Sequence, residues 1–267
     1  MDRSTCASSR RPQGGASLEQ TTKLVTPHVQ AGWVLGLYPD AGEASGTFQY
    51  RARERGCETV GPALDPERSA SEARRASGMV RRFVAANRLD RLGTLTYRGE
   101  GLHDERALRR HVAHFFKRVR YELVEEPYPY LWVPEWHKTD HGLHVHFGVD
   151  RFLRQDSLAG LWGRGFVHIK RLGRTGAGTL ASARRAAGYL SKYVGKSFEN
   201  HERAPGLHRY ECAQGFKPLV ERIVANSRLE AIELASNRMG RSPTKIWHSP
   251  KDEEWQGPPA VWMAWDD

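Results

Sequence analysis

The stretch Leu143-His-Val-His-Phe-Gly-Val149 carries large apolar side chains at every second position. This period of two is typical of a β-strand with one face against a core, because successive side chains of a strand point to opposite faces. The pattern predicts a strand over 143–149 that holds the imidazoles of His144 and His146 side by side on its other face.

A second stretch of strand character lies at residues 130–137, and the polar residues between the two stretches favour a hairpin turn. Alternation places Glu135 and His137 on one face of this strand. We expect the hairpin to pair His137 with His144. The same register pairs Glu135 with His146, so that all four polar side chains share one face of the hairpin.

Two imidazoles and a carboxylate within reach of one another suit a divalent cation, because both kinds of group offer lone pairs to the ion. We expect Glu135, His144 and His146 to be the ligands, with His137 in reserve. The open alternative is a solvent-facing polar side of an edge hairpin, since a short His-x-His pattern is weak by itself.

Further elements flank the hairpin on both sides. Residues 92–97 have strand character, and residues 104–124 carry apolar side chains at helical spacing. The buried face of that helix is expected to consist of Leu108, Val112, Phe115, Phe116 and Val119. A fourth strand is predicted at 166–171, and further helices at 157–162, 180–196 and 219–239.

At 267 residues the chain is long enough for one well-buried domain with extensions. We expect the central domain over 88–218. An arm and accessory segment would precede it at 1–87, and a helical extension and tail would follow at 219–267. Residues 1–30 hold few large apolar side chains and are expected to be flexible.

Four side chains recur at helical spacing within the predicted helix 180–196: Tyr189, Lys192, Tyr193 and Lys196. This spacing places them along one stripe. A phenol is a weak nucleophile at its ordinary pKa of about 10, but neighbouring cations and a metal on a phosphate would favour its attack. The residue types fit phosphoryl transfer. The alternative is an aromatic stripe packed into a core, with lysines at its rim.

The chain is strongly basic, with 41 Lys and Arg against 31 Asp and Glu, a formal net charge of +10 and a pI near 9.7. This balance favours a polyanionic partner, nucleic acid first. We find no apolar span of about 20 residues and no secretory signal, so a cytoplasmic protein without a membrane role is expected. The three cysteines lack the spacing of a zinc site or a disulfide framework.

The order of Thr94-Leu-Thr-Tyr97, His144-Val-His146 and Tyr189-Leu-Ser-Lys192-Tyr193 resembles the three motifs of the HUH endonuclease superfamily. The resemblance covers about residues 90–200 and is to the rolling-circle replication initiators of plasmids and single-stranded DNA phages. It implies an α+β fold with a central, RRM-like antiparallel β-sheet flanked by helices. It also implies a Mg²⁺ or Mn²⁺ ion on the two histidines and a third polar ligand, which Glu135 fits best.

The resemblance further implies nicking and rejoining of single-stranded DNA through a covalent 5′-phosphotyrosine. Tyr189 would be the nucleophile, Tyr193 a second nucleophile of the phage-initiator kind, and Lys192 would assist at the phosphate. Candidate DNA contacts are Lys196, Arg184, Arg185, Thr94, Thr96 and Tyr97. Side chains that could also grip or stack on a strand are Arg81, Arg82, Trp132, Trp136 and Trp162.

The expected partners are single-stranded DNA or an extruded origin hairpin, together with a helicase and a polymerase of the host. A host helicase is needed because the sequence carries no G-x-x-x-x-G-K-[ST] phosphate loop. The oligomeric state stays open.

Three other functions remain alternatives. A transposase or mobilisation relaxase would share the chemistry and differ in its biological use. A non-enzymatic origin- or operator-binding protein would bind DNA without a metal and form no covalent adduct. A zinc hydrolase would also use two histidines and a glutamate, although the His-Glu-x-x-His helix pattern is missing.

Overall fold

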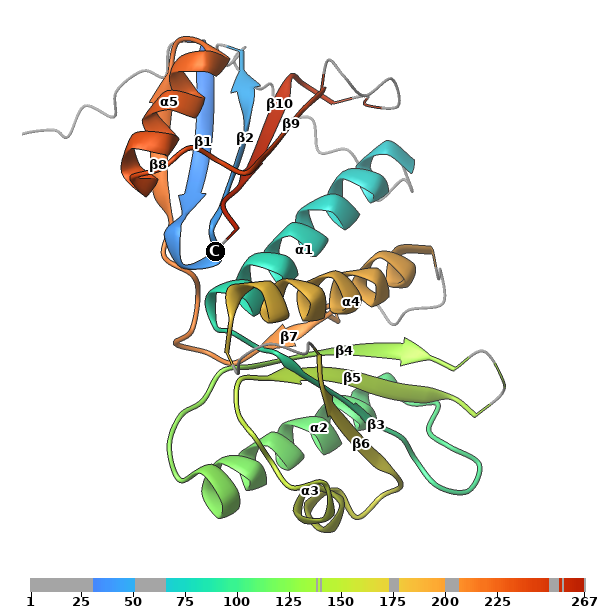
Figure 1. Ribbon diagram of the computed structural model, residues 1–267. Coiled ribbons are helices and arrows are strands. Elements are labelled where there is room, and N and C mark those ends of the chain that lie inside the picture. The colour runs from blue at the N-terminus through green and yellow to red at the C-terminus, as the bar shows by residue number, and fades with distance from the viewer. Residues whose placement is uncertain are drawn as a thin grey trace, which may run out of the picture.

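The computed structural model describes residues 31–50, 66–137, 139, 141–172, 178–199, 207–249, 255 and 257–266. The arm expected at 1–30 lies outside these residues. Within them the chain forms two five-stranded antiparallel β-sheets and five α-helices, which confirms the α+β class (Figure 1). Among the described helices, none has both the length and the apolar character that a membrane crossing requires.

The first sheet, called the β5 sheet after its central strand, has the order β6-β3-β5-β4-β7 with all neighbours antiparallel. Its strands are β3 (Arg91–Leu95), β4 (Tyr130–Trp136), β5 (Leu143–Val149), β6 (Val167–Arg171) and β7 (Glu211–Cys212). The four strands predicted from the sequence are confirmed. The two-residue β7 adds an edge that no local pattern indicated.

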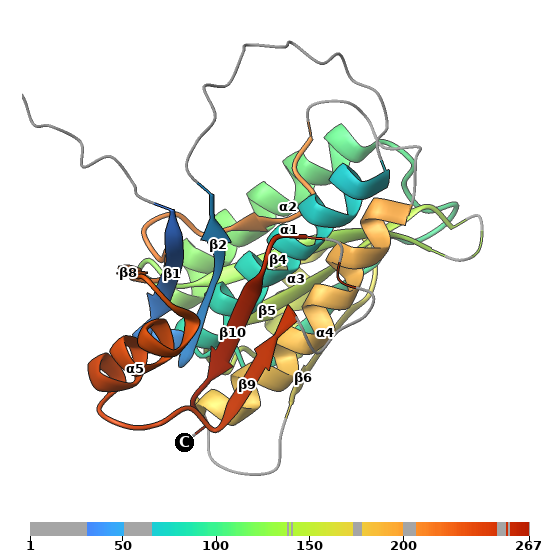
Figure 2. The same ribbon diagram turned by 90° about the horizontal axis from the view of Figure 1, so that it is seen from above.

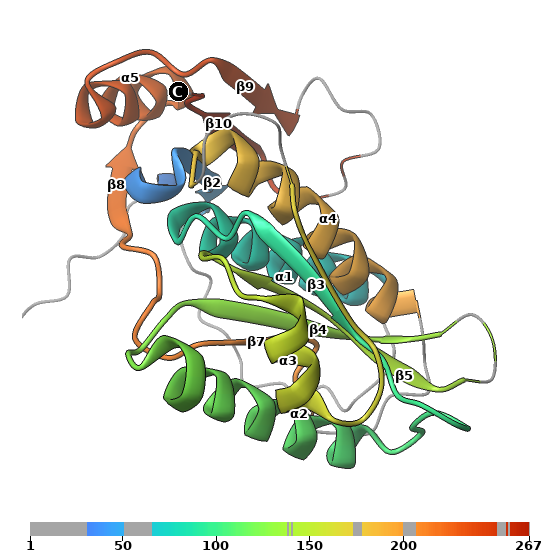
Figure 3. The same cartoon turned by 60° about the horizontal axis from the view of Figure 1, so that its bottom comes forward.

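Helices cover both faces of the β5 sheet (Figure 3). One face packs on α2 (Glu105–Val119) and α3 (Gln155–Trp162), and the other packs on α1 (Pro66–Ala86) and α4 (Leu180–Glu199). The apolar face of β5 lies in the core with α2 and α3, as predicted. The histidine face is also covered in part, because α1 and α4 pack against it.

α2 forms where the apolar spacing predicted a helix. The Asp104 side chain caps it by accepting hydrogen bonds from the backbone N–H groups of Arg106 at 2.8 Å and Ala107 at 3.2 Å. The predicted buried face is confirmed in full: Leu108, Val112, Phe115, Phe116 and Val119. A π-helical turn, η2 (Arg120–Val124), continues the helix.

The hairpin of β4 and β5 differs from the predicted register by two residues. Glu135 lies opposite His144, and the backbone N–H of His137 donates to the Gly142 carbonyl at 2.8 Å. Glu135 therefore does not pair with His146. His137 likewise does not pair with His144. Gly142 closes the turn with φ of +75°, which glycine adopts without strain, and this shortens the loop. A shift of two keeps every side chain on its predicted face.

The second sheet, called the β1 sheet, has the order β8-β1-β2-β10-β9, again with all neighbours antiparallel. Its strands are β1 (Gly32–Tyr38), β2 (Glu43–Gln49), β8 (Glu221–Ala225), β9 (Lys245–His248) and β10 (Ala260–Ala264). A short 3-10 turn, η1 (Pro39–Ala41), joins its first two strands, and α5 (Arg228–Met239) packs on one of its faces (Figure 2). This sheet was not predicted, because it unites segments from both ends of the chain.

The helix predicted over 219–239 begins only at Arg228, and residues 221–225 form β8 instead. The start is set by Ser227, whose side chain accepts a hydrogen bond from the backbone N–H of Glu230 at 3.1 Å. Ahead of that cap the apolar residues alternate, and this pattern suits a strand. The C-terminal extension thus contributes three strands besides its helix.

The helices α1 and α4 lie between the two sheets (Figure 1). Arg82 of α1 donates to the Glu43 carboxylate of β2 at 3.2 Å. Arg184 of α4 donates to the Gly42 carbonyl at 2.6 Å and forms an ion pair with Asp266. These contacts tie the β1 sheet to the helical layer on which the tyrosines of α4 lie.

Candidate metal and tyrosine site

The predicted metal ligands come from neighbouring strands of the β5 sheet and share its α4 face. Glu135 of β4 lies opposite His144 of β5, and His146 of β5 lies opposite Thr94 of β3. Directly opposed residues of an antiparallel pair project to the same face, so these side chains form one compact patch. His146 is buried and the other three are half-buried.

Three donor atoms of this patch converge. Oε2 of Glu135 lies 3.0 Å from Nε2 of His144 and 2.8 Å from Nε2 of His146, and the two nitrogens are 3.0 Å apart. Ligands at right angles around an ion at about 2.1 Å would be spaced by about 3 Å, which is the spacing expected of neighbouring ligands in an octahedral shell. Within the described residues no other set of three such donors comes together. The donor set therefore fits a divalent cation.

Hydrogen bonding and burial leave these groups in the forms that bind a metal. Nδ1 of His146 lies 3.2 Å from Oγ1 of Thr94, which can accept its hydrogen and leave the Nε2 lone pair for an ion. Burial lowers the pKa of His146, which favours the neutral ring. Burial raises the pKa of Glu135, but hydrogen bonds with both histidines outweigh this and hold that pKa well below its usual range.

The reserve ligand, His137, lies at the rim of the patch. Its ring centroid is 5.5 Å from that of His144, and its Nδ1 atom lies 2.7 Å from the hydroxyl of Thr139. His137 is exposed and is not part of the converging group.

α4 is anchored beside the patch by a stripe of buried side chains, Ala183, Ala186, Ala187, Leu190 and Val194. The close approach of Leu190 depends on Gly148 of β5, since a Cβ there would lie 3.1 Å from the Leu190 side chain. The neighbouring stripe, which carries the two tyrosines, is thereby directed at the metal group.

Both tyrosine rings contact the imidazole of His146 or each other. Tyr193 stacks on His146 with ring centroids 3.7 Å apart and planes 14° from parallel. The Tyr189 ring lies edge-on, 6.5 Å from the His146 ring and 5.2 Å from the Tyr193 ring. Burial, together with a hydrogen bond with Tyr189, raises the pKa of Tyr193. Tyr189 is 42% exposed and is the more accessible phenol.

The lysine that reaches the metal group is Lys196, which the sequence indicated only as a DNA contact. Its Nζ atom lies 3.2 Å from Oε1 of Glu135 and 5.2 Å from the centre of the Tyr193 ring. Lys192, one turn earlier, is exposed, and so is Arg185. The stripe thus presents one lysine to the ligands and another to solvent.

Several expected DNA contacts instead hold the fold together. Arg184 binds the Asp266 carboxylate and three backbone carbonyls. Arg81 and Arg82 both bind Glu43, at 3.3 and 3.2 Å. The partners of these cations are distant in sequence, so charge alone could not reveal the structural role.

The first motif, on β3, divides between the site and the core. Thr94 contacts His146, whereas the Thr96 hydroxyl bonds to the backbone of Phe166. Tyr97 is buried, its hydroxyl lies 3.1 Å from Nδ1 of His111, and burial raises its pKa. Thr94 is therefore the member of this motif that reaches the metal group.

The tryptophans considered as stacking platforms are mostly core residues. Trp132 and Trp162 are 4% and 3% exposed. Only Trp136 is half-buried, with its ring near His103. The exposed fractions favour packing over base stacking for the first two.

A residue that the sequence reasoning missed is His168 of β6, which lies directly opposite Thr94. It is exposed and continues the cross-strand row that contains His146. The signal was the alternation of buried Val167 with exposed His168, which marks the chemical face of the fourth strand.

Residues 90–198 match the family model of the Replication-associated protein ORF2 type. The matched segment contains the three motifs and the helix that carries both tyrosines, which confirms the resemblance over that range. No match was found among the curated proteins or among the solved structures. The β1 sheet lies outside the matched segment.

Proposed function

We propose that this chain, whose residues 90–198 belong to the family of Replication-associated protein ORF2, nicks and rejoins single-stranded DNA to initiate rolling-circle replication of a plasmid or phage. One observation carries the proposal: the Tyr193 ring stacks on His146 while Tyr189 lies exposed beside it. A phenol and a converging His-His-Glu group in one place are the components that tyrosine attack on a phosphodiester requires.

The role of the converging group is to hold a divalent cation, Mg²⁺ or Mn²⁺, on Glu135, His144 and His146. When bound, such an ion would polarise the scissile phosphate and stabilise the charge that develops during attack. Thr94 orients the His146 ring through its Nδ1 atom. The stacked Tyr193 ring restrains the same imidazole from the other side.

In the nicking step the phenolic oxygen of Tyr189 forms a bond to phosphorus as the bond from phosphorus to the 3′ oxygen breaks. The phenol loses its proton to solvent, and the leaving oxygen takes up a proton to become the 3′-hydroxyl that primes synthesis. The 5′ phosphate stays on the tyrosine, so the energy of the ester bond is retained for rejoining. Tyr189 is favoured for the first attack because it is the more exposed of the two phenols.

The lysines of α4 supply positive charge along the same stripe. Lys196 lies 3.2 Å from Glu135 and can shift to a phosphate oxygen when DNA occupies the site. Lys192 is exposed beside Tyr189 and is assigned to orient the strand. Tyr193, whose raised pKa keeps its proton, is assigned to the second transfer, in which the strand moves between tyrosines.

The test uses labelled single-stranded DNA from the origin of the replicon that encodes the chain. With Mn²⁺ the protein should form an adduct that survives denaturing electrophoresis, and EDTA should prevent it. The His144→Ala variant should form none, although its circular dichroism spectrum stays that of the parent. DNA binding that ignores EDTA, without an adduct, would favour the non-enzymatic alternative.

A transposase or mobilisation relaxase would form the same adduct and therefore needs another test. The family description favours replication, since it is replication-associated. Supplying the chain to a plasmid that carries only the origin should restore its replication in a host, and the Tyr189→Phe variant should not. Transfer of the plasmid without its replication would point to mobilisation.

A further inference from the structure

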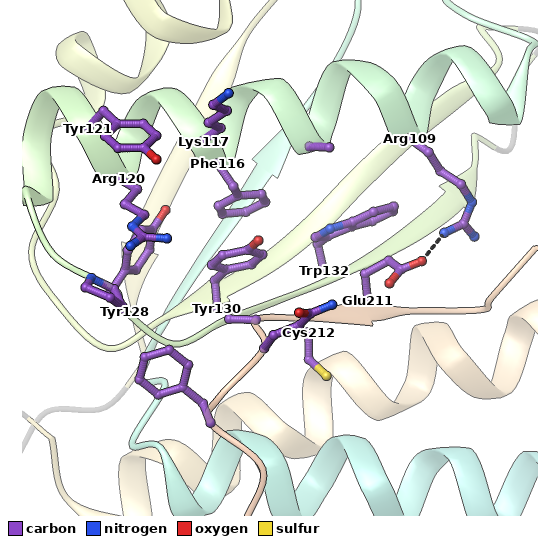
Figure 4. A pocket seen from close by; sticks show the side chains of 15 residues that line it. Arg109, Phe116, Lys117, Arg120, Tyr121, Tyr128, Tyr130, Trp132, Glu211 and Cys212 are labelled. Carbon is purple, nitrogen blue, oxygen red and sulfur yellow. Dashed lines mark hydrogen bonds and ion pairs between the residues drawn. The ribbon is translucent and has the colours of Figure 1, made fainter. Parts of the chain in front are cut away.

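A cavity of about 540 Å³ lies at the β7 edge of the β5 sheet, between α2 and β4 (Figure 4). Tyr130 and Trp132 of β4 project into it, whereas Glu135 of the same strand projects to the opposite face of the sheet. The cavity is therefore separate from the metal group. Residues of its wall that matter here are Phe116, Lys117, Arg120, Tyr121, Tyr128 and Tyr130.

The wall is unusually aromatic. The rings of Phe116 and Tyr130 are stacked, with centroids 4.1 Å apart and planes 3° from parallel. At the rim Tyr121 leaves 64% of its surface exposed. An exposed ring beside an aromatic wall offers a face on which a nucleobase can stack, whatever its sequence.

Cations surround the same opening. Lys117 and Arg120 are exposed on α2 and η2, and the Arg120 guanidinium lies 5.6 Å from the centre of the Tyr121 ring. Arg109 is bound to Glu211 at 2.7 Å, so the two rim cations carry the net charge of the cavity. Positive charge next to a stacking surface complements a phosphate attached to a base.

One polar atom of the wall lacks a partner. The side chain of Tyr128 is 2% exposed, and its hydroxyl makes no hydrogen bond within the described part of the chain. In Figure 4 its ring rises from the strand toward Arg120. A buried hydroxyl without a partner is unfavourable, and a ligand acceptor that enters as Arg120 moves aside would satisfy it.

We propose that this cavity binds a nucleotide unit of single-stranded DNA, with the base against Tyr121 and the phosphate on Lys117 and Arg120. The strand would pass around the short β7 edge from the metal face to the α2 face. Such a second hold would keep the DNA on the protein while its ends are exchanged. The proposal rests on the proposed function only for the expectation that the chain meets a single strand.

The test measures binding without nicking, by fluorescence anisotropy in EDTA with the Tyr189→Phe, Tyr193→Phe double variant. The probe is oligothymidylate of about 20 nucleotides, longer than a typical single-strand site. In this background Tyr121→Ala should weaken binding about 5- to 100-fold, the range measured for losing one stacked base. Removing both rim cations by Lys117→Ala and Arg120→Ala should lower the slope of log K against log salt by about 1.4.

The matched control removes two other exposed cations of α2, by Arg106→Ala and Arg110→Ala. Equal weakening by the control pair would overturn the proposal, and so would unchanged binding by Tyr121→Ala. Free thymidine monophosphate should compete only weakly; competition as strong as that of the oligonucleotide would replace the strand with a free nucleotide. Because no step involves metal or cleavage, a failed nicking assay would leave this outcome unaffected.

A second variant separates ligand contact from folding. Tyr128→Phe removes the unpartnered hydroxyl, so the free energy of unfolding should stay the same or rise. Binding of the oligonucleotide should nevertheless weaken about 5-fold, the effect of one lost hydrogen bond. Lower stability with unchanged binding would contradict the assignment of this hydroxyl to the ligand.

Discussion

The ring of Tyr193 lies flat on the imidazole of His146, with centroids 3.7 Å apart. This contact joins α4 to β5 and restrains the ring that presents one of the three converging donor atoms. We expect Tyr193→Phe to keep the stacking and the Mn²⁺ affinity. Tyr193→Ala should lower that affinity about 10-fold, because orientation of a ligand is lost. Calorimetric titration of both variants checks this, and equal affinities would contradict it.

Thr94 restrains the same imidazole from β3. Thr94→Val removes the hydroxyl that faces Nδ1 of His146 at 3.2 Å and keeps the shape of the side chain. We expect Mn²⁺ affinity and nicking to fall about 10- to 100-fold, as for other partners of metal-bound histidines. Thr94→Ser keeps the hydroxyl and should stay close to the parent. An unaffected valine variant would mean that the contact does not set the ring.

Arg184 is expected to act on stability. Its guanidinium binds Asp266 and three backbone carbonyls, and its side chain is 22% exposed. Arg184→Ala should lower the free energy of unfolding by about 2 kcal/mol, because hydrogen bonds to a charged group are lost. The exposed neighbour Arg185, changed to alanine, should alter it by less than about 0.5 kcal/mol. Urea unfolding distinguishes the two, and a neutral Arg184→Ala would refute the structural role.

Gly93 gives a sharp test of the packing beneath the site. A Cβ at this position would lie 2.0 Å from the ring of Phe147, so the ring and the strand must move. Gly93→Ala should therefore lower the free energy of unfolding by about 3 kcal/mol or more. In contrast, Gly160 of α3 has open space, and Gly160→Ala should raise stability by about 0.5 to 1 kcal/mol. Similar thermal midpoints for both variants would contradict this packing.

Much of the β5 sheet could be predicted from local pattern. The face assignments of Glu135 and His144 followed from alternation alone, because a strand has a period of two whatever its partner. The register could not be predicted, since it depends on the turn that Gly142 closes. That glycine is required by a neighbour distant in sequence: a Cβ there would lie 2.2 Å from the carbonyl oxygen of Leu102.

The β1 sheet escaped prediction for a similar reason. Its strands β2 and β10 pair Thr47 with Ala260, so the sheet forms only when the two ends of the chain meet. The functions of the arginines were hidden in the same way, since Arg184 and its partner Asp266 are far apart in sequence. Local spacing did place both tyrosines on one stripe, but their approach to His146 depends on the tertiary packing of α4.

The central claim is that Tyr189 becomes linked to the 5′ phosphate. Trypsin separates the two tyrosines, because Arg185, Lys192 and Lys196 leave Tyr189 in the peptide 186–192 and Tyr193 in the peptide 193–196. After a single round of nicking with Mn²⁺, digestion of the DNA leaves a nucleotide on the linked residue. Mass spectrometry should find that mass on peptide 186–192. A nucleotide on peptide 193–196 alone would reverse the roles of the tyrosines, and one on neither would contradict the account.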